Sequence, residues 1–77
     1  MLTAAQCRMA RAALKLEVRE LADAANVSTS TIVRFERGEA LLLRTVDAIR
    51  TTLEARGVEF TDGGAVKLAE KGKGKRK

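Results

Sequence analysis

The 77-residue sequence contains no histidine, proline, tryptophan or tyrosine, and its single cysteine is Cys7. With one cysteine and no histidine, the chain has neither the partners of an internal disulfide nor the usual ligands of a zinc site. We therefore expect no metal and no cofactor. We expect Cys7 to be a small buried apolar residue, as free cysteines usually are.

Aromatic side chains are limited to two phenylalanines, so the core of this one small domain must come from Leu, Val, Ile and Ala. The absence of proline and the abundance of Ala, Leu, Glu and Arg favour helices. No apolar run approaches the ~20 residues of a membrane span, and no signal-peptide pattern is present. We expect a cytoplasmic protein without a membrane partner.

The net charge of +5 is unevenly distributed. Residues 1–68 contain ten Lys and Arg against nine Asp and Glu, whereas residues 69–77, AEKGKGKRK, contain five basic residues and one acidic residue. The latter segment has no apolar face and is expected to be a disordered basic tail, either an arm that binds phosphates or a solubilising end. Because the rest of the chain is nearly neutral, total charge alone does not indicate nucleic-acid binding.

Hydrophobic spacing and capping residues predict about four helices in residues 1–57. Thr3 and Gln6 form a capping-box pattern before a helix at 4–14. A second helix, at about 18–25, ends at Asn26, which tolerates a left-handed backbone. Ser28 is a strong N-cap for a third helix at 29–37. The fourth helix ends at Gly57 and carries one apolar stripe of Leu42, Val46, Ile49 and Leu53.

The hydrophobic period changes to two in residues 58–68, VEFTDGGAVKL. This alternation around TDGG predicts a β-hairpin with a four-residue turn. A two-stranded ribbon is marginal alone, so its apolar face must be covered. The face is either a dimer interface or a surface that packs under the chain's own helices. It carries Val58, Phe60, Val66 and Leu68.

The predicted third helix has one apolar and one polar face. On a helical wheel Ile32 and Phe35 share a face, while Ser30, Arg34 and Arg37 lie opposite. Such a polar face on a short helix is often only solvated. However, two short helices joined by a tight turn form a helix-turn-helix, and hydroxyl and guanidinium groups suit the acceptor-rich major groove of DNA.

Residues 18–37, VRELADAANVSTSTIVRFER, resemble the helix-turn-helix of the phage-repressor and Cro-like (XRE) family of transcription regulators. The matching features are ELA at 20–22, the Val27-Ser28 turn, and FERGE at 35–39. The resemblance covers roughly residues 4–57. It implies a mainly α fold that binds double-stranded DNA, in a bacterial or phage repressor or activator that is nucleoid-associated. Because no pair of carboxylates is set in a plausible cleft and no glycine-rich phosphate loop follows a strand, we do not expect an enzyme.

The resemblance also implies roles for individual residues. Thr29, Ser30 and Arg34 are the expected base contacts. The family often joins an Arg of the first helix to a Glu of the recognition helix, and Arg11 and Glu36 occupy these places. We interpret them as a partly buried structural ion pair, the alternative being two solvated charges worth under ~1 kcal/mol. The expected phosphate contacts are Ser28, Thr31, Arg37 and Arg44. The alternative for Arg44 is a charged side chain that contacts only solvent.

The sequence departs from the family pattern at the start of the second helix and in the turn. Glu17 and Val18 replace a small polar N-cap and a Gln that often assists at a phosphate, and Asn26 replaces a Gly. The predicted hairpin also replaces the family's last helix, so the family's dimer contact does not carry over.

These observations predict a DNA-binding domain at residues 1–57, a possible dimerisation hairpin at 58–68 and a basic tail at 69–77. The predicted function is a sequence-specific regulator that binds two DNA half-sites as a homodimer, with centres ~34 Å or a multiple apart. The alternative is a protein-interaction module on the same fold, such as an antiactivator or antitoxin, which binds a protein through the recognition-helix face.

Overall fold

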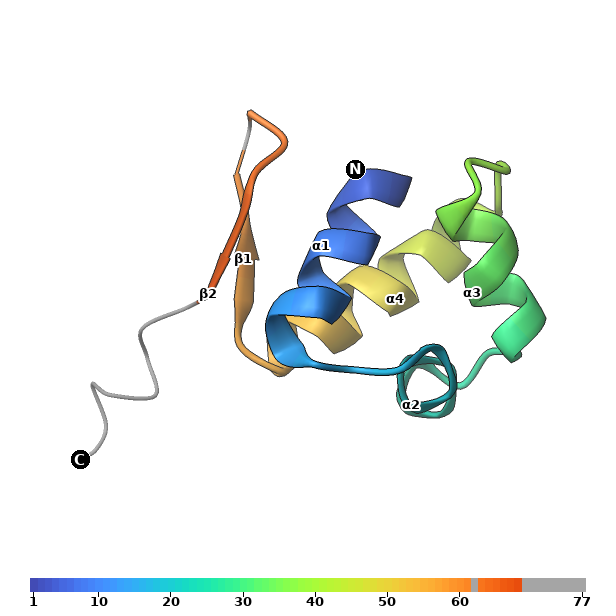
Figure 1. The fold of residues 1–77 in the computed structure, drawn as a ribbon. Helices are drawn as coiled ribbons and strands as arrows, with labels where there is room; N and C mark the ends of the chain where they lie inside the picture. The colour runs from blue at the N-terminus through green and yellow to red at the C-terminus, as the bar shows by residue number, and fades with distance from the viewer. Residues whose placement is uncertain (62, 69–77) are drawn as a thin grey trace.

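The computed structural model describes residues 1–61 and 63–68; Asp62 and the predicted basic tail at 69–77 lie outside the described residues. The chain folds into helices α1 (Ala4–Leu14), α2 (Val18–Ala25), α3 (Thr29–Glu36) and α4 (Leu43–Ala55), followed by strands β1 (Val58–Phe60) and β2 (Val66–Leu68) (Figure 1). The mainly α fold class and the terminal hairpin are confirmed. Within the described part of the chain, no helix is both long and apolar enough to span a membrane.

The helix ends follow from local residue chemistry. At α1 the backbone N–H of Gln6 donates to Thr3 Oγ1 at 3.1 Å, and the N–H of Thr3 donates to Gln6 Oε1 at 3.0 Å. Asn26 ends α2 in the left-handed region, at φ 63°. At the start of α2, Glu20 accepts a hydrogen bond from the backbone of Glu17 at 2.8 Å. The capping box at α1 and the left-handed Asn26 are therefore confirmed.

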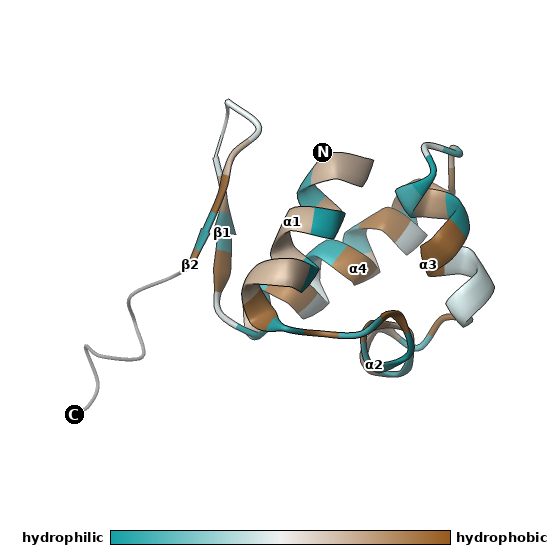
Figure 2. Cartoon of the chain, viewed as in Figure 1, coloured by the Kyte–Doolittle hydropathy of each residue, from teal (hydrophilic) through white to brown (hydrophobic). Residues whose placement is uncertain are grey.

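The helices surround one hydrophobic core, to which each of them contributes buried apolar residues. Hydrophobic and hydrophilic positions alternate along each helix (Figure 2). Cys7 is fully buried, as expected. Leu42, however, does not extend the apolar stripe of α4: it is the N-cap and is 63% exposed. Leu41 packs against the core in its place. The largest fully buried side chains are those of Leu21, Ile32, Ile49, Leu53 and Cys7.

The hairpin packs on its own helices. Its antiparallel register pairs Val58 with Leu68 and Phe60 with Val66. Val58 is buried in the core, Phe60 and Val66 pack against it, and Leu68 is 53% exposed. The hairpin lies beside α1, at the opposite end of the molecule from α3 (Figure 1).

Candidate nucleic-acid interface

Helices α2 and α3 and the short turn between them form a helix-turn-helix. The left-handed Asn26 reverses the chain, and the backbone N–H of Val27 donates to the carbonyl of Ala22 at 2.9 Å. The small buried side chains of Ala22 and Ala25 allow α3 to pack closely across α2. The turn therefore fixes the direction in which α3 leaves α2.

The first turn of α3 contains four consecutive hydroxyl residues, at 28–31, and is coloured nearly white on the hydropathy scale (Figure 2). Ser28 caps the helix, because its Oγ accepts the backbone N–H of Thr31 at 3.0 Å. The two side-chain oxygens, Ser28 Oγ and Thr31 Oγ1, also lie 2.9 Å apart. One hydroxyl donates to the other, so the accepting hydroxyl keeps its own hydrogen for an outside acceptor such as a phosphate.

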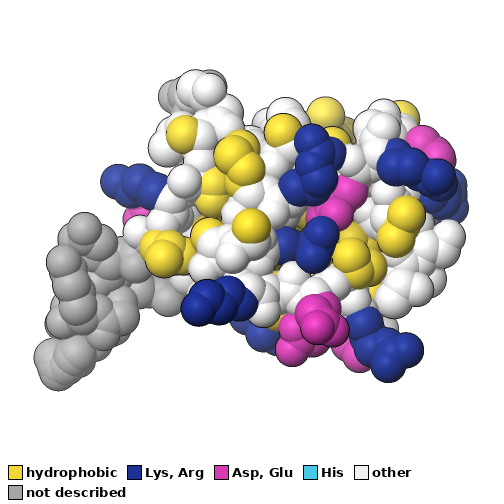
Figure 3. Space-filling view, in the orientation of Figure 1, with side chains coloured by type: hydrophobic (Ala, Val, Ile, Leu, Met, Phe, Trp, Pro, Cys, Tyr) yellow, Lys and Arg dark blue, Asp and Glu magenta, His cyan; other side chains and the backbone are white. Residues whose placement is uncertain are grey.

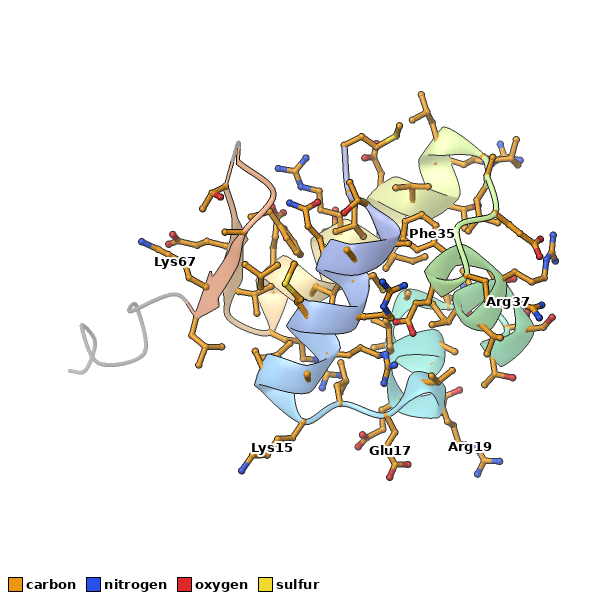
Figure 4. The ribbon with its side chains drawn as sticks, turned by 45° about the horizontal axis from the view of Figure 1, so that its top comes forward. Lys15, Glu17, Arg19, Phe35, Arg37 and Lys67 are labelled. Atoms are coloured by element: carbon orange, nitrogen blue, oxygen red, sulfur yellow. The ribbon has the colours of Figure 1, made fainter. Side chains whose placement is uncertain are left out.

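One side of α3 is buried and the other is accessible. Ile32 and Phe35 lie in the core, and Phe35 points from α3 into the interior in Figure 4. The side chains expected to contact bases are all exposed, and Arg37 points outward at the end of the helix (Figure 4). The structure thus exposes Ser30, Arg34 and Arg37 on the side of α3 away from the core, and Thr29 in the first turn of the helix.

The first turn of α4 lies next to α3. A shallow groove between them is lined by residues of both segments, among them Ser28, Thr31, Arg34 and Thr45. Arg44 precedes Thr45 and is exposed. The structure therefore places Arg44 on an element adjacent to α3, and Arg44 makes no ion pair within the described residues.

The C-terminal end of α3 is held by α1. Arg11 donates from Nε to Glu36 Oε2 at 2.7 Å and from Nη2 to Glu36 Oε1 at 2.9 Å. The Cys7 thiol donates to the same Oε2 at 3.2 Å. Arg8, for which no role was predicted, donates from Nη1 to the backbone carbonyl of Glu36. Three side chains of α1 thus fix the position and rotation of α3.

The pKa values of this cluster reflect burial and the ion pair. Burial disfavours the charged form of Glu36, but hydrogen bonds from Arg11 and Cys7 outweigh it and lower the pKa of Glu36. Burial, followed by the hydrogen bond to Glu36 and its negative charge, raises the pKa of Cys7 to about 12. The hydrogen bond to Glu36 raises the pKa of Arg11. At neutral pH the cluster therefore contains a carboxylate, a guanidinium ion and a neutral thiol.

An acidic residue, Glu39, lies directly beside the exposed arginines. Its Oε1 accepts a hydrogen bond from Arg34 Nε at 3.1 Å, and its Oε2 lies 3.8 Å from Arg37 Nη2. Basic and acidic side chains lie side by side at this end of the molecule in the space-filling view (Figure 3). This contact was not predicted from the sequence. The one indication of it there is that an acidic residue, Glu39, directly follows Gly38, which ends the helix.

Two short helices, a tight turn and an accessible polar face on the second helix define a helix-turn-helix domain of the DNA-binding class. A helix-turn-helix family model (HTH_3) matches residues 8–56, and the chain belongs to this XRE-type family of DNA-binding regulators. No curated protein matches the chain.

Proposed function

We propose that the protein regulates transcription by reading double-stranded DNA with α3 in the major groove. The observation that carries this proposal is the two-sided arrangement of α3. Its accessible face presents Thr29, Ser30 and Arg34, while its other face is fixed by the core and by the ion pair of Glu36. A rigidly held helix that exposes donors along one face suits a groove wide enough to admit an α-helix.

The residue types suggest that different positions along α3 contact bases and phosphates. Arg34 donates in parallel to O6 and N7 of a guanine, which is the commonest specific contact in the major groove. Thr29 and Ser30 are shorter and reach base edges only where the N-terminal end of the helix enters the groove. Ser28 and Thr31 bind a phosphate together with the free backbone amides of the first turn. Arg37 and Arg44 bind phosphates on either side.

We further propose that the protein binds its operator as a homodimer. One α3 helix reads only a few base pairs, and two-fold operators with half-sites ~34 Å or a multiple apart match dimeric helix-turn-helix proteins. The hairpin and α3 lie at opposite ends of the molecule (Figure 1). Joining two copies at their hairpins would therefore place the recognition helices at the two outer ends. Leu68, a large apolar residue of the hairpin that is 53% exposed, is the best candidate for the contact.

A second candidate function is protein binding by the same face. The large apolar side chains of Val33, Leu42 and Leu43 are exposed near the polar face of α3. The nearly neutral charge of residues 1–68 also contributes little attraction to DNA. An antiactivator or antitoxin would use these side chains as anchors for a protein partner.

Selection from a random pool of double-stranded DNA, with the full chain as bait, separates these functions. We expect enrichment of a short motif that contains a guanine and is repeated as an inverted pair. A pool that stays random after several rounds at low salt contradicts the DNA-reading function and favours a protein partner. Low salt is required because phosphate contacts weaken steeply as salt rises.

A further inference from the structure

Glu39 contacts Arg34, the residue proposed above to bind a guanine. Building on the function proposed above, we propose that Glu39 is a positioning residue, which orients Arg34 so that its terminal nitrogens face a guanine. Glu39 itself is acidic and close to the expected path of the phosphates, where a negative charge weakens binding. Because Glu39 is expected to weaken affinity, the benefit that it could bring to DNA binding is a gain in sequence specificity.

The geometry of the contact leaves the reading end of Arg34 available. Glu39 engages Nε, the nitrogen nearest the aliphatic part of the side chain. Neither Nη1 nor Nη2 of Arg34 forms a hydrogen bond with any described residue. A guanidinium ion has five N–H donors in a fixed planar fork, so holding Nε sets the plane in which the two terminal nitrogens lie.

The backbone at the end of α3 holds Glu39 in place. Gly38, at φ +100°, ends the helix in a conformation that other residues rarely adopt. The backbone N–H of Glu39 then donates to the carbonyl of Arg34 at 3.1 Å, and that of Gly38 to the carbonyl of Phe35 at 2.9 Å. These are the two hydrogen bonds of a Schellman motif. The motif fixes the main chain of Glu39 to the same residue that its side chain contacts.

Glu39 also contacts the second exposed arginine. Its other carboxylate oxygen lies 3.8 Å from Arg37 Nη2, so one carboxylate lies between both guanidinium ions. Arg37 is the more exposed of the two, with 67% of its side chain accessible against 48% for Arg34. We expect Arg37 to leave the carboxylate for a phosphate, while Arg34 keeps its contact and reads the base.

The test compares Glu39→Ala and Glu39→Gln in binding titrations on the selected site and on the same site with the guanine replaced. Glu39→Ala removes the acceptor of Arg34 Nε, whereas Glu39→Gln keeps an oxygen acceptor and removes only the charge. Glu54→Gln is the matched control. It removes the same charge from a similarly exposed pair on α4, in which Arg50 Nε lies 3.0 Å from Glu54 Oε2.

We expect both Glu39 variants to bind all sequences more tightly, because a negative charge near the phosphates is lost. The preference for guanine should fall about two- to fivefold in Glu39→Ala, as expected for the loss of an exposed ion pair. Glu39→Gln should keep most of that preference, and Glu54→Gln should keep all of it. Thermal unfolding followed by circular dichroism verifies that each variant is folded.

A guanine preference that is unchanged in Glu39→Ala overturns the inference, since Glu39 would then only oppose phosphates by its charge. An equal loss of preference in Glu39→Ala and Glu39→Gln also contradicts orientation through the acceptor oxygen. Both outcomes leave the proposed DNA-reading function intact. A parent protein without any base preference instead overturns that function, and the role of Glu39 with it.

Discussion

Arg11 of α1 and Glu36 of α3 form two parallel hydrogen bonds, of 2.7 and 2.9 Å, across 25 positions of the sequence. Only 9% of the Glu36 side chain and 22% of the Arg11 side chain are accessible. Arg11 also donates to the carbonyl of Leu16 at 3.0 Å, so it connects α3 to the segment between α1 and α2. The pair thus joins the recognition helix to the rest of the domain.

Arg11→Ala should destabilise the fold strongly, because it leaves the Glu36 carboxylate largely buried without its partner. Fully buried pairs lose about 3–5 kcal/mol when one partner is removed, and the partial exposure of Arg11 lowers our expectation to about 2–3 kcal/mol. Arg50→Ala, which breaks the exposed pair with Glu54, should cost under about 1 kcal/mol. Urea unfolding of both variants measures the difference; equal losses would show that the Arg11 pair is no more than a surface contact.

The same pair makes stability depend on pH. The pKa of Glu36 is lowered in the folded protein, so its ionised form contributes stability above the pKa of the unfolded chain, about 4.3. That contribution is lost as the pH falls through the lower pKa of the folded state. We expect the free energy of unfolding of the parent to exceed that of Glu36→Gln at pH 7, and the gap to close in acid. A gap that stays constant from pH 7 to pH 3 would contradict this.

The hairpin prediction is best tested at Leu68. Phe60 packs against the core, so an aspartate there would disturb the monomer itself, whereas Leu68 is 53% exposed. Leu68→Asp should give a folded monomer by light scattering, with weaker binding to a two-half-site operator. Lys67→Ala, on the opposite face of β2, should remain dimeric. A Leu68→Asp protein that is still a dimer would place the interface elsewhere.

The basic tail should strengthen binding without affecting sequence choice. Five of its nine residues are basic, and each phosphate neutralised adds about 0.9 to the slope of log affinity against log salt. Removing residues 70–77 should flatten that slope by up to ~4 and leave base preference unchanged. An unaltered slope would mean that the tail does not contact DNA and serves solubility.

The parts of the fold that depend on near neighbours in the sequence could be predicted. The Thr3–Gln6 capping box follows from two residue types three positions apart, and the left-handed Asn26 follows from a single residue type. The three consecutive leucines at 41–43 show where such reasoning fails. By helical spacing Leu42 and Leu43, four and three residues before Val46, are the two that can extend the stripe of α4. In the structure both are exposed, and Leu41, which precedes α4, packs against the core instead.

The contacts around the recognition helix depend on the folded backbone. Arg8 donates to the carbonyl of a residue 28 positions away, which no spacing in the sequence indicates. Glu39 contacts Arg34 because the chain turns back after Gly38. The polar face of α3 could be predicted from the sequence. Of the residues that orient α3 and its side chains, the Arg11–Glu36 pair was predicted, whereas Arg8 and Glu39 were not.

The most direct test of the DNA-reading function is a binding titration of Arg34→Ala against the selected site and each of its single-base changes. A bidentate bond to guanine is worth roughly 1–3 kcal/mol of discrimination, so the variant should bind the preferred site about 5- to 150-fold more weakly. It should also lose preference at one base position in each half-site, with little change in thermal stability because Arg34 is exposed. Arg37→Ala should instead weaken all sequences to a similar extent, as expected for a phosphate contact. An Arg34→Ala protein that keeps the full base preference of the parent would contradict the assignment of α3 as the reading helix through Arg34.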